Sequence, residues 1–446
     1  MANPDQAPPA TYWHTSPIRR LGQTALFLLG SRAAFGVVNL LAAAVAVHAV
    51  GLAAFGAVVL CHAVARLVGE TLRFQSWQAI LTFGTPMLDR GEGGALRRLL
   101  GTTIALDVAA LALALGLLMI FAPMLGAALG WPPAVQEWVR LYALAAIFMT
   151  SATPTGVLRL IDRFDILNWQ HALNALIRLG GALAVLGLGL GLDALFMVWF
   201  GAAVLSGGWM IARAALLGRA MLRALPEGAG EPRPEGFWRF VFSTNLSSSV
   251  SGALLHGSTL AVGAVLGPAA SALYAIARQI SDALAKPAKL LAPVMLPAFS
   301  ETRSDAVGGA PALVSRTLGL GALAMAAIVV AVALGGDLLL ATAFGEEALA
   351  AHALLFLAAT AAAITLCGFA LEPAILAARR ADLALMLSLS AAVVYAALMV
   401  WLLPSLGLLG AGAALLAHAI LLFTGRLVAA RTVLRGRAPF SQPETA

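Results

Sequence analysis

Charged side chains recur at helical spacing inside stretches that are otherwise apolar. One stretch holds three of them on a single helical face: Arg66, Glu70 and Arg73. Another holds four: Arg278, Asp282, Lys286 and Lys289. A charge at the centre of a membrane helix costs about 2.5–3.5 kcal/mol on insertion scales, so such residues usually face a cavity. If these stretches cross a membrane, the spacing predicts a polar lumen between them.

Other apolar stretches add polar residues to the same lumen. Arg32 and Asn39 are seven apart, and Asp107 stands alone in its stretch. Two further polar stripes follow helical spacing: His171, Asn174 and Arg178, then Asn245, Ser249, Gly252 and His256. Seven basic residues (Arg32, Arg66, Arg73, Arg178, Arg278, Lys286 and Lys289) minus three acidic residues (Glu70, Asp107 and Asp282) give the predicted lumen a net charge of +4.

A basic lumen predicts an anionic ligand. The chain has 28 Lys and Arg residues, and its only lysines are Lys286 and Lys289. A lysine ammonium is a compact, mobile point charge, so this exception to the use of arginine favours ligand binding. A lipid diphosphate would place its headgroup among these cations while its tail stays in the bilayer. Neutral side chains could then contact sugar hydroxyls or line the lumen: Asn39, Asn174, Asn245, Ser249 and His256.

Each of these residues also has a structural interpretation. Arg278–Asp282 and Asp282–Lys286 are i,i+4 pairs that could neutralise each other within one helix, whereas Lys289 has no acid three or four residues before it. Arg178 could extend to lipid headgroups, and histidines inside helices are more often packing residues. Three acids are candidates for coupling to a proton or Na⁺, or are structural counter-charges: Glu70, Asp107 and Asp282.

The sequence predicts no bound cofactor and no metal. Motifs for nucleotide hydrolysis and for zinc binding are absent from the sequence, and its seven histidines are scattered. Cys61 and Cys367 lie in apolar stretches and are expected to be buried thiols.

The composition identifies the elements that position these charges. Of the 446 residues, 61% are hydrophobic and 11% are charged, and the mean hydropathy is +0.91. A soluble protein has about 25% charged residues. The chain is therefore expected to be an all-α integral membrane protein. Its net charge of +7 does not indicate a nucleic-acid partner.

Apolar stretches predict twelve membrane helices, at 21–48, 52–82, 96–121, 135–158, 168–190, 193–217, 237–265, 269–299, 312–335, 346–375, 381–403 and 407–430. The loops between them alternate between arginine-rich segments and segments without Lys or Arg. Because basic loops stay cytoplasmic, both termini are predicted to be cytoplasmic. The chain is expected to be a multi-pass membrane protein.

The longest interior polar segment divides the chain into two halves. The predicted organisation is a disordered cytoplasmic tail at 1–18, a six-helix lobe at 19–217, a cytoplasmic linker at 218–236, a six-helix lobe at 237–430 and a tail at 431–446. The second helix of each half opens similarly, at 51–56 and 267–272, and the fourth carries Pro154 or Pro373 near its end. Repeats of this kind place a substrate between pseudo-symmetric lobes and work by alternating access.

Three segments resemble the polysaccharide-transporter, or O-antigen flippase, family of the multidrug/oligosaccharidyl-lipid/polysaccharide exporter superfamily. They are 237–245 (FWRFVFSTN), 266–280 (LGPAASALYAIARQI) and 296–300 (LPAFS), with 52–56 and 159–165 similar in the first half. The resemblance implies two lobes in a V around a basic cavity. It also implies a location in the bacterial inner membrane and export of an undecaprenyl-diphosphate-linked oligosaccharide for surface polysaccharide synthesis, alongside a polysaccharide polymerase and other assembly proteins. Related peptidoglycan-lipid flippases keep arginines at places similar to those of Arg32, Arg66 and Arg278.

Two alternatives are weighed against a flippase. A cation-coupled multidrug antiporter could share the fold, although organic cations favour acidic cavities. A membrane polysaccharide polymerase or ligase is an enzyme, and such enzymes carry large external loops, whereas every predicted external turn here is short. The chain is therefore expected not to be an enzyme.

Overall fold

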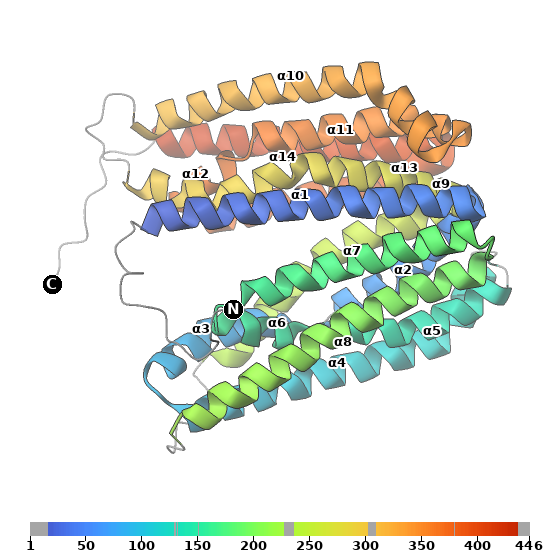
Figure 1. The fold of residues 1–446 in the computed structure, drawn as a ribbon. Coiled ribbons are helices and arrows are strands. Elements are labelled where there is room, and N and C mark those ends of the chain that lie inside the picture. Colours follow the sequence, from blue (N-terminus) through green and yellow to red (C-terminus); the bar gives the residue numbers. More distant parts are fainter. Residues whose placement is uncertain are drawn as a thin grey trace, which may run out of the picture.

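The computed structural model describes residues 17–128, 131, 133–149, 151–226, 236–301, 309–378 and 380–435. Within these ranges the regular structure is helical throughout (Figure 1). In the first half the helices are α1 (Pro17–Val50), α2 (Leu52–Leu72), α3 (Ser76–Asp89), α4 (Gly93–Ala128), α5 (Pro133–Met149), α6 (Ala152–Leu160), α7 (Phe164–Gly187) and α8 (Leu192–Ala224). In the second half they are α9 (Phe237–Glu301), α10 (Gly309–Phe344), the short 3₁₀ helix η2 (Glu346–Ala351), α11 (His352–Cys367), α12 (Leu371–Ala377), α13 (Ala381–Leu406) and α14 (Leu408–Arg435).

The helices have the length and hydropathy of membrane spans. Eight helical segments in the described ranges can cross a bilayer by these criteria, in α2, α4, α8, α9, α10, η2–α12, α13 and α14. The all-α membrane fold is therefore confirmed, while the count of twelve spans and the cytoplasmic termini remain predictions. Only 17% of the apolar window of α4 and 6% of that of α10 is buried in the protein, so these two helices face lipid.

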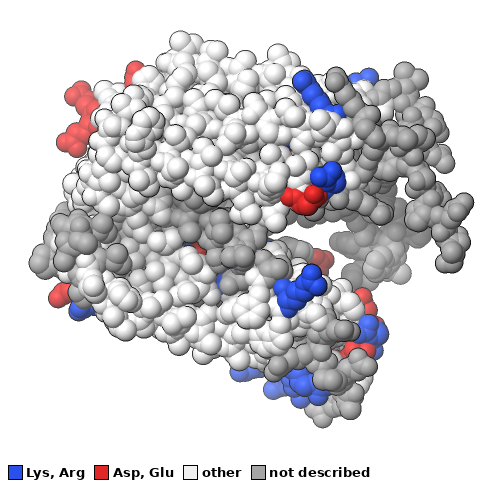
Figure 2. Space-filling view, turned by 180° about the vertical axis from the view of Figure 1, so that it is seen from behind, with Lys and Arg blue, Asp and Glu red and all other residues white. Residues whose placement is uncertain are grey.

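Helices of the two halves form two groups. In Figure 1, α10 to α14 lie above and α2 to α8 lie below, with α1 between the groups. The groups meet mainly where α2 packs along α9, and α1 packs on α7 and α9. Figure 2 shows the surface hollowed between the groups, toward the end where Lys and Arg gather.

Corresponding helices of the two halves are interrupted at corresponding places. Gly51 precedes α2 with φ 85° and ψ 162°, and Gly267 interrupts α9 with φ 86° and ψ 178°. Glycine adopts this conformation without the penalty that a Cβ would impose. Similarly, α5 is followed by the short α6, and α11 by the short α12. The shared breaks match the repeat inferred from the sequence.

The predicted helix boundaries need three corrections. The second predicted helix, 52–82, ends as α2 at Leu72 and resumes as α3 at Ser76, because Arg73 is extended (φ −65°, ψ 123°). The fourth, 135–158, is split between α5 and α6, with Ser151 extended. The tenth, 346–375, is divided into η2, α11 and α12. The prediction for the cysteines is confirmed, since Cys61 and Cys367 are buried free thiols.

The two halves touch most closely at the start of α2. Gly56 lies so near Pro268 of α9 that a Cβ built on Gly56 would overlap the Pro268 carbonyl group. The hydroxyl of Ser271 donates a hydrogen bond of 2.6 Å to the Pro268 carbonyl oxygen and also lies 3.4 Å from the Gly56 carbonyl oxygen. The start of α2 lies at the end of the molecule far from α3 (Figure 1), and there the Gly56–Pro268 contact holds the two halves together.

Candidate functional site

A cavity of about 970 Å³ lies between helices of the first half and α9 of the second half. It is lined by side chains from α1, α2, α5, α6, α7, α8 and α9. Six cations and two acids line it among the described residues: Arg66, Arg73, Arg159, Arg178, Arg278 and Lys286, with Glu70 and Asp282. Six minus two gives a net charge of +4. The predicted basic lumen is thus present, with a partly different set of residues.

At one wall of the cavity an ion-pair cluster joins the two halves. One carboxylate oxygen of Glu70, on α2, lies 3.0 Å from a guanidinium nitrogen of Arg66, one helical turn earlier. The other oxygen lies 3.2 Å from Nε2 of His256 on α9. Arg66 also reaches the carbonyl oxygen of Met149 at 3.5 Å, where α5 ends. Glu70 therefore neutralises one arginine of its own helix and contacts the opposite half at the same time.

Arg178 lies deep in the cavity wall and does not extend to lipid headgroups. Its guanidinium carbon lies 5.5 Å from the ring centroid of Trp199 on α8. Its Nε is buried and has no hydrogen-bond partner among the described residues. A guanidinium held by an aromatic ring in this way keeps donors available for an anion.

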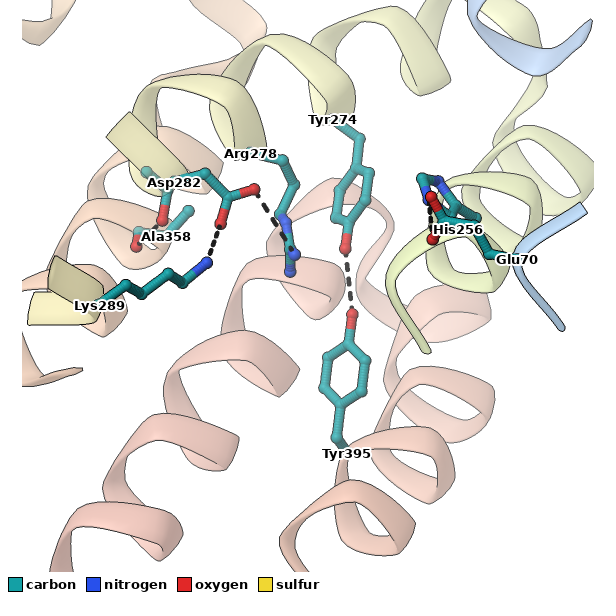
Figure 3. Close-up of polar contacts among 9 residues, drawn as sticks. Glu70, His256, Tyr274, Arg278, Asp282, Lys289, Ala358 and Tyr395 are labelled. Atoms are coloured by element: carbon teal, nitrogen blue, oxygen red, sulfur yellow. Dashed lines mark hydrogen bonds and ion pairs between the residues drawn. The ribbon is translucent and has the colours of Figure 1, made fainter. Parts of the chain in front are cut away.

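The charged residues of α9 form a second cluster, drawn in Figure 3. Asp282 lies 4.0 Å from Arg278 and 3.9 Å from Lys289, which is therefore paired with an acid seven residues earlier. Lys289 is 67% exposed and is not among the cavity-lining residues, whereas Lys286 is. Beside Arg278, the hydroxyl groups of Tyr274 and Tyr395 are 3.0 Å apart and connect α9 to α13.

Asp107 occupies a different place from the other acids. One carboxylate oxygen accepts a hydrogen bond of 2.7 Å from the hydroxyl of Ser76, the first residue of α3. The other accepts one of 2.7 Å from the backbone N–H of Thr153, in the first turn of α6. The first N–H groups of a helix have no partner within that helix, and Asp107 supplies one. The carboxylate thus fixes the starts of two helices that follow breaks.

The predicted neutral polar residues are placed as follows. Asn39 and Asn174 line the cavity; the first donates to the carbonyl oxygen of Phe35 at 2.9 Å, and the second to the hydroxyl of Ser206 at 3.1 Å. His256 lines the cavity as well. The side chains of Arg32, Asn245 and Ser249 lie outside the described residues.

Sequence reasoning missed several residues of the cavity. The predicted helix 135–158 leaves Arg159 in the arginine-rich loop that follows it, but α6 continues to Leu160. The guanidinium carbon of Arg159 lies 4.1 Å from the ring centroid of Trp77. His62 of α2 and Asn168 of α7 also line the cavity. Asn168 precedes His171 and Asn174 at spacings of three, so extending the stripe toward the start of α7 would have found it.

Outside the membrane spans, an arginine just before a helix pairs with an aspartate in the first turn of that helix. Arg163 precedes α7 and donates two hydrogen bonds of 2.8 Å to Asp165, and this contact lowers the pKa of Asp165. Arg380 contacts Asp382 at the start of α13 in the same way. An acid in the first turn also interacts favourably with the helix dipole. Equivalent helices of the two halves thus begin with the same pair.

Comparisons with known proteins agree with this architecture. No protein-family model matches the chain. The chain is 30% identical over 346 residues to the inner membrane protein YghQ of Escherichia coli K12, covering 76% of this chain and 96% of YghQ. Among solved structures, a multidrug resistance MATE family transporter of the MOP superfamily, in an inward-facing conformation, matches with TM-score 0.71, 13% identity and coverage of 90% of this chain and 96% of that one.

Two further solved structures share the fold. The lipid II flippase MurJ in an inward closed conformation matches with TM-score 0.66 and 12% identity, over 92% of this chain and 87% of that one. A mutant of the MATE transporter VcmN of Vibrio cholerae matches with TM-score 0.53 and 17% identity, over 94% and 97%. The chain therefore has the fold of these MATE and MurJ structures. The two-lobe fold that the resemblance implied is confirmed, and membership of the O-antigen flippase family stays a prediction.

Proposed function

Because this chain belongs to the family of the Escherichia coli inner membrane protein YghQ and has the fold of MOP-superfamily transporters, we propose that it is a flippase. It moves an undecaprenyl-diphosphate-linked oligosaccharide across the bacterial inner membrane by alternating access. The product serves the synthesis of a surface polysaccharide such as O-antigen, capsule or exopolysaccharide. A polymerase and other assembly proteins would then act on the glycan.

The observation that carries this proposal is the net charge of +4 on the described lining of the cavity. Guanidinium groups bind phosphate through paired, charge-assisted hydrogen bonds. In a site of low dielectric such bonds replace the water around a diphosphate. At about 970 Å³ the cavity is at the upper end of the size of ligand pockets, so it has room for the diphosphate and the first sugars. The apolar tail stays in the bilayer.

Within the cavity the residues divide into two kinds. The cavity-lining cations supply diphosphate contacts, foremost Arg66, Arg178 and Arg278, with Arg73 and Lys286 as further candidates. Arg32 and Lys289 stay candidates from the sequence alone. The neutral residues face sugar hydroxyls, and these are Asn39, Asn174 and His256, with Asn245 and Ser249 as candidates from the sequence alone. Arg159 is a further candidate for binding the diphosphate because it lines the same cavity.

Transport against a gradient needs an energy source, and Glu70 is the foremost candidate for coupling. It contacts Arg66 and also His256 of the opposite half. An incoming diphosphate would compete with Glu70 for Arg66, and a proton or Na⁺ would then replace the lost cation. Asp282 is a second candidate. Asp107 is a weaker one, since both of its oxygens already accept hydrogen bonds from helix starts.

A multidrug antiporter is the second candidate, because the same fold serves MATE transporters. The charge of the cavity distinguishes the two functions. An organic cation would meet a net charge of +4 and would be repelled, whereas a diphosphate would be attracted. A drug substrate for this chain would therefore have to be anionic or neutral.

Flipping in reconstituted vesicles tests the proposal. A fluorescent lipid-linked diphosphate oligosaccharide is incorporated in both leaflets, and a membrane-impermeant reductant bleaches what is exposed outside. With wild-type protein, nearly all of the probe is expected to become accessible to the reductant. The inner-leaflet fraction of a neutral glycolipid of equal tail length should stay protected. Imposed pH and Na⁺ gradients then identify the coupling ion. Absence of flipping together with drug efflux from the same vesicles would refute the proposal in favour of the antiporter.

Substitutions locate the site in the same assay. Arg66→Ala and Arg278→Ala each remove a charge-assisted contact worth about 1.5–3 kcal/mol, so the flipping rate should fall at least about tenfold. Arg178→Lys should also lower it, because lysine keeps the charge but loses the planar contact with Trp199. Arg431→Ala, at an exposed position of α14, is the matched control and should flip normally. In cells, surface polysaccharide unchanged in alanine variants of Arg32, Arg66, Arg278 and Lys289 alike would refute the site.

A further inference from the structure

A second, smaller pocket lies within the first half, among α2, α4, α6 and α8. Its volume is about 310 Å³, and almost all of its surface is apolar. Aliphatic side chains form most of its walls: Ile104, Val108, Leu111, Val157, Ile211 and Ala214. This acyl-chain pocket is distinct from the cavity between the halves.

The mouth of the acyl-chain pocket faces the bilayer. Ile104 and Val108 of α4 are 51% and 59% exposed. They belong to a helix whose apolar window is only 17% buried. Asp107 lies nine residues beyond Arg98, the last arginine at the start of α4, which is about 14 Å at about 1.5 Å per residue. The mouth therefore opens well inside the hydrocarbon layer, where water and sugars are absent.

The inner end of the pocket meets the central cavity. Arg73 and Ser151 line both spaces. They lie at the two helix breaks that Asp107 holds, between α2 and α3 and between α5 and α6. An arginine has an aliphatic stem as well as a charged head, so one side chain can bound an apolar pocket and an anion site together.

From this geometry we propose that the pocket binds one acyl chain of a bilayer phospholipid. A dry cavity of about 150 Å³ holds a benzene molecule, so 310 Å³ accommodates a segment of aliphatic chain. An apolar pocket open to lipid gains free energy when an acyl chain restores the missing dispersion contacts. The carboxylate of Asp107 also lines the pocket, but both of its oxygens already accept hydrogen bonds. A sugar headgroup or a hydrated ion would therefore find little hydrogen-bonding surface there.

The tail of the transported lipid does not fit this position. With its headgroup in the central cavity, that tail would have to be threaded past Arg73 and Ser151 in every cycle, whereas a neighbouring phospholipid inserts a chain directly from the bilayer. A bound acyl chain packs against Arg73 on the side that lines the acyl-chain pocket. It thereby links the composition of the bilayer to a cation of the central site, and the proposal stands whatever substrate is transported.

Photolabelling of the full chain in phospholipid vesicles tests this inference without any transported substrate. The probe is a phosphatidylethanolamine with a diazirine in the middle of one acyl chain, and labelled residues are mapped by mass spectrometry. Label is expected on 104–111 of α4 and on 211–215 of α8. Val108→Trp fills the mouth and should lower the label on 211–215 at least fivefold, read on a segment whose sequence is unchanged.

Matched variants separate pocket filling from other effects. Val393→Trp places the same side chain at a 68% exposed position of α13 and should leave the label on 211–215 unchanged. Ile104→Trp fills the mouth from one turn earlier and should act like Val108→Trp, and thermal unfolding checks that each variant is folded. Equal label on 211–215 in wild type and both filled variants would overturn the inference. So would label spread evenly along the lipid-facing side of α4. A chain without flippase activity that still labels at 211–215 would refute only the proposed function.

Discussion

Replacing Gly56 by alanine is expected to open the end of the molecule that the Gly56–Pro268 contact closes. The added Cβ would overlap the carbonyl carbon and oxygen of Pro268 and lie 3.2 Å from its Cα. These are backbone atoms, so no side-chain rotation relieves the overlap, and α2 must move away from α9. The 3.4 Å contact between the Ser271 hydroxyl and the Gly56 carbonyl oxygen would be lost with that movement, whereas the bond of Ser271 to Pro268 within α9 would stay.

Overpacking of this kind costs about 1–3 kcal/mol. The cost falls only on the conformation that contains the contact, so it shifts the equilibrium toward an opened conformation about 5- to 150-fold. Spin labels at residues 53 and 265, both exposed, would report the change as a second, longer distance in double electron–electron resonance. Gly116→Ala is the matched control, since a Cβ on Gly116 meets nothing within 4 Å. A distance distribution for Gly56→Ala that equals those of wild type and Gly116→Ala would refute the reasoning.

Three further predictions concern polar contacts. Asp107→Ala removes the acceptor for the Ser76 hydroxyl and for the Thr153 N–H, so it should lower the free energy of unfolding by about 1–3 kcal/mol. Thermal denaturation measures this loss, and an unchanged midpoint would show that the carboxylate does not hold the starts of α3 and α6. Glu70→Gln and His256→Asn should be non-additive, with an interaction energy of about 0.5–3 kcal/mol in a double-mutant cycle; additive effects would mean that the contact between the halves is not formed. The Arg163 contact lowers the pKa of Asp165, so its stabilisation is present above the ordinary aspartate pKa and is lost as the pH falls through the lowered value. Asp165→Asn should therefore cost up to about 1 kcal/mol at neutral pH and nothing in strong acid, and a cost independent of pH would contradict the assignment.

The fold class and much of the cavity could be predicted from the sequence. Membrane helices followed from composition, and charges within apolar stretches identified Arg66, Arg178 and Arg278 because a lipid-facing charge is costly. Gly51 and Gly267 marked the start of equivalent helices because each lies between two apolar stretches in the same local pattern. These signals are local, so one sequence carries them.

The helix breaks and ion-pair partners depend on distant residues. Pro154 and Pro373 lie in the first turns of α6 and α12, where proline costs no hydrogen bond, yet the unbroken apolar stretch hides the break before each. The break after Leu72 has no proline, and part of what stabilises it is Asp107, at a distant position in the sequence. Lys289 finds its acid at a spacing of seven, beyond the reach of the i,i+4 rule.

Because lysine is scarce in the sequence, chemical modification of the native lysines can report on access to the central cavity. Lys286 lines the central cavity and Lys289 is 67% exposed, and no other lysine occurs in the sequence. An amine-reactive reagent can therefore modify side chains only on one turn of α9. A bulky acylating agent should reach Lys289 readily and Lys286 only through the open end of the cavity. The ratio of the two products would then record, without any introduced cysteine or label, how often that end is open and whether a bound anion covers it.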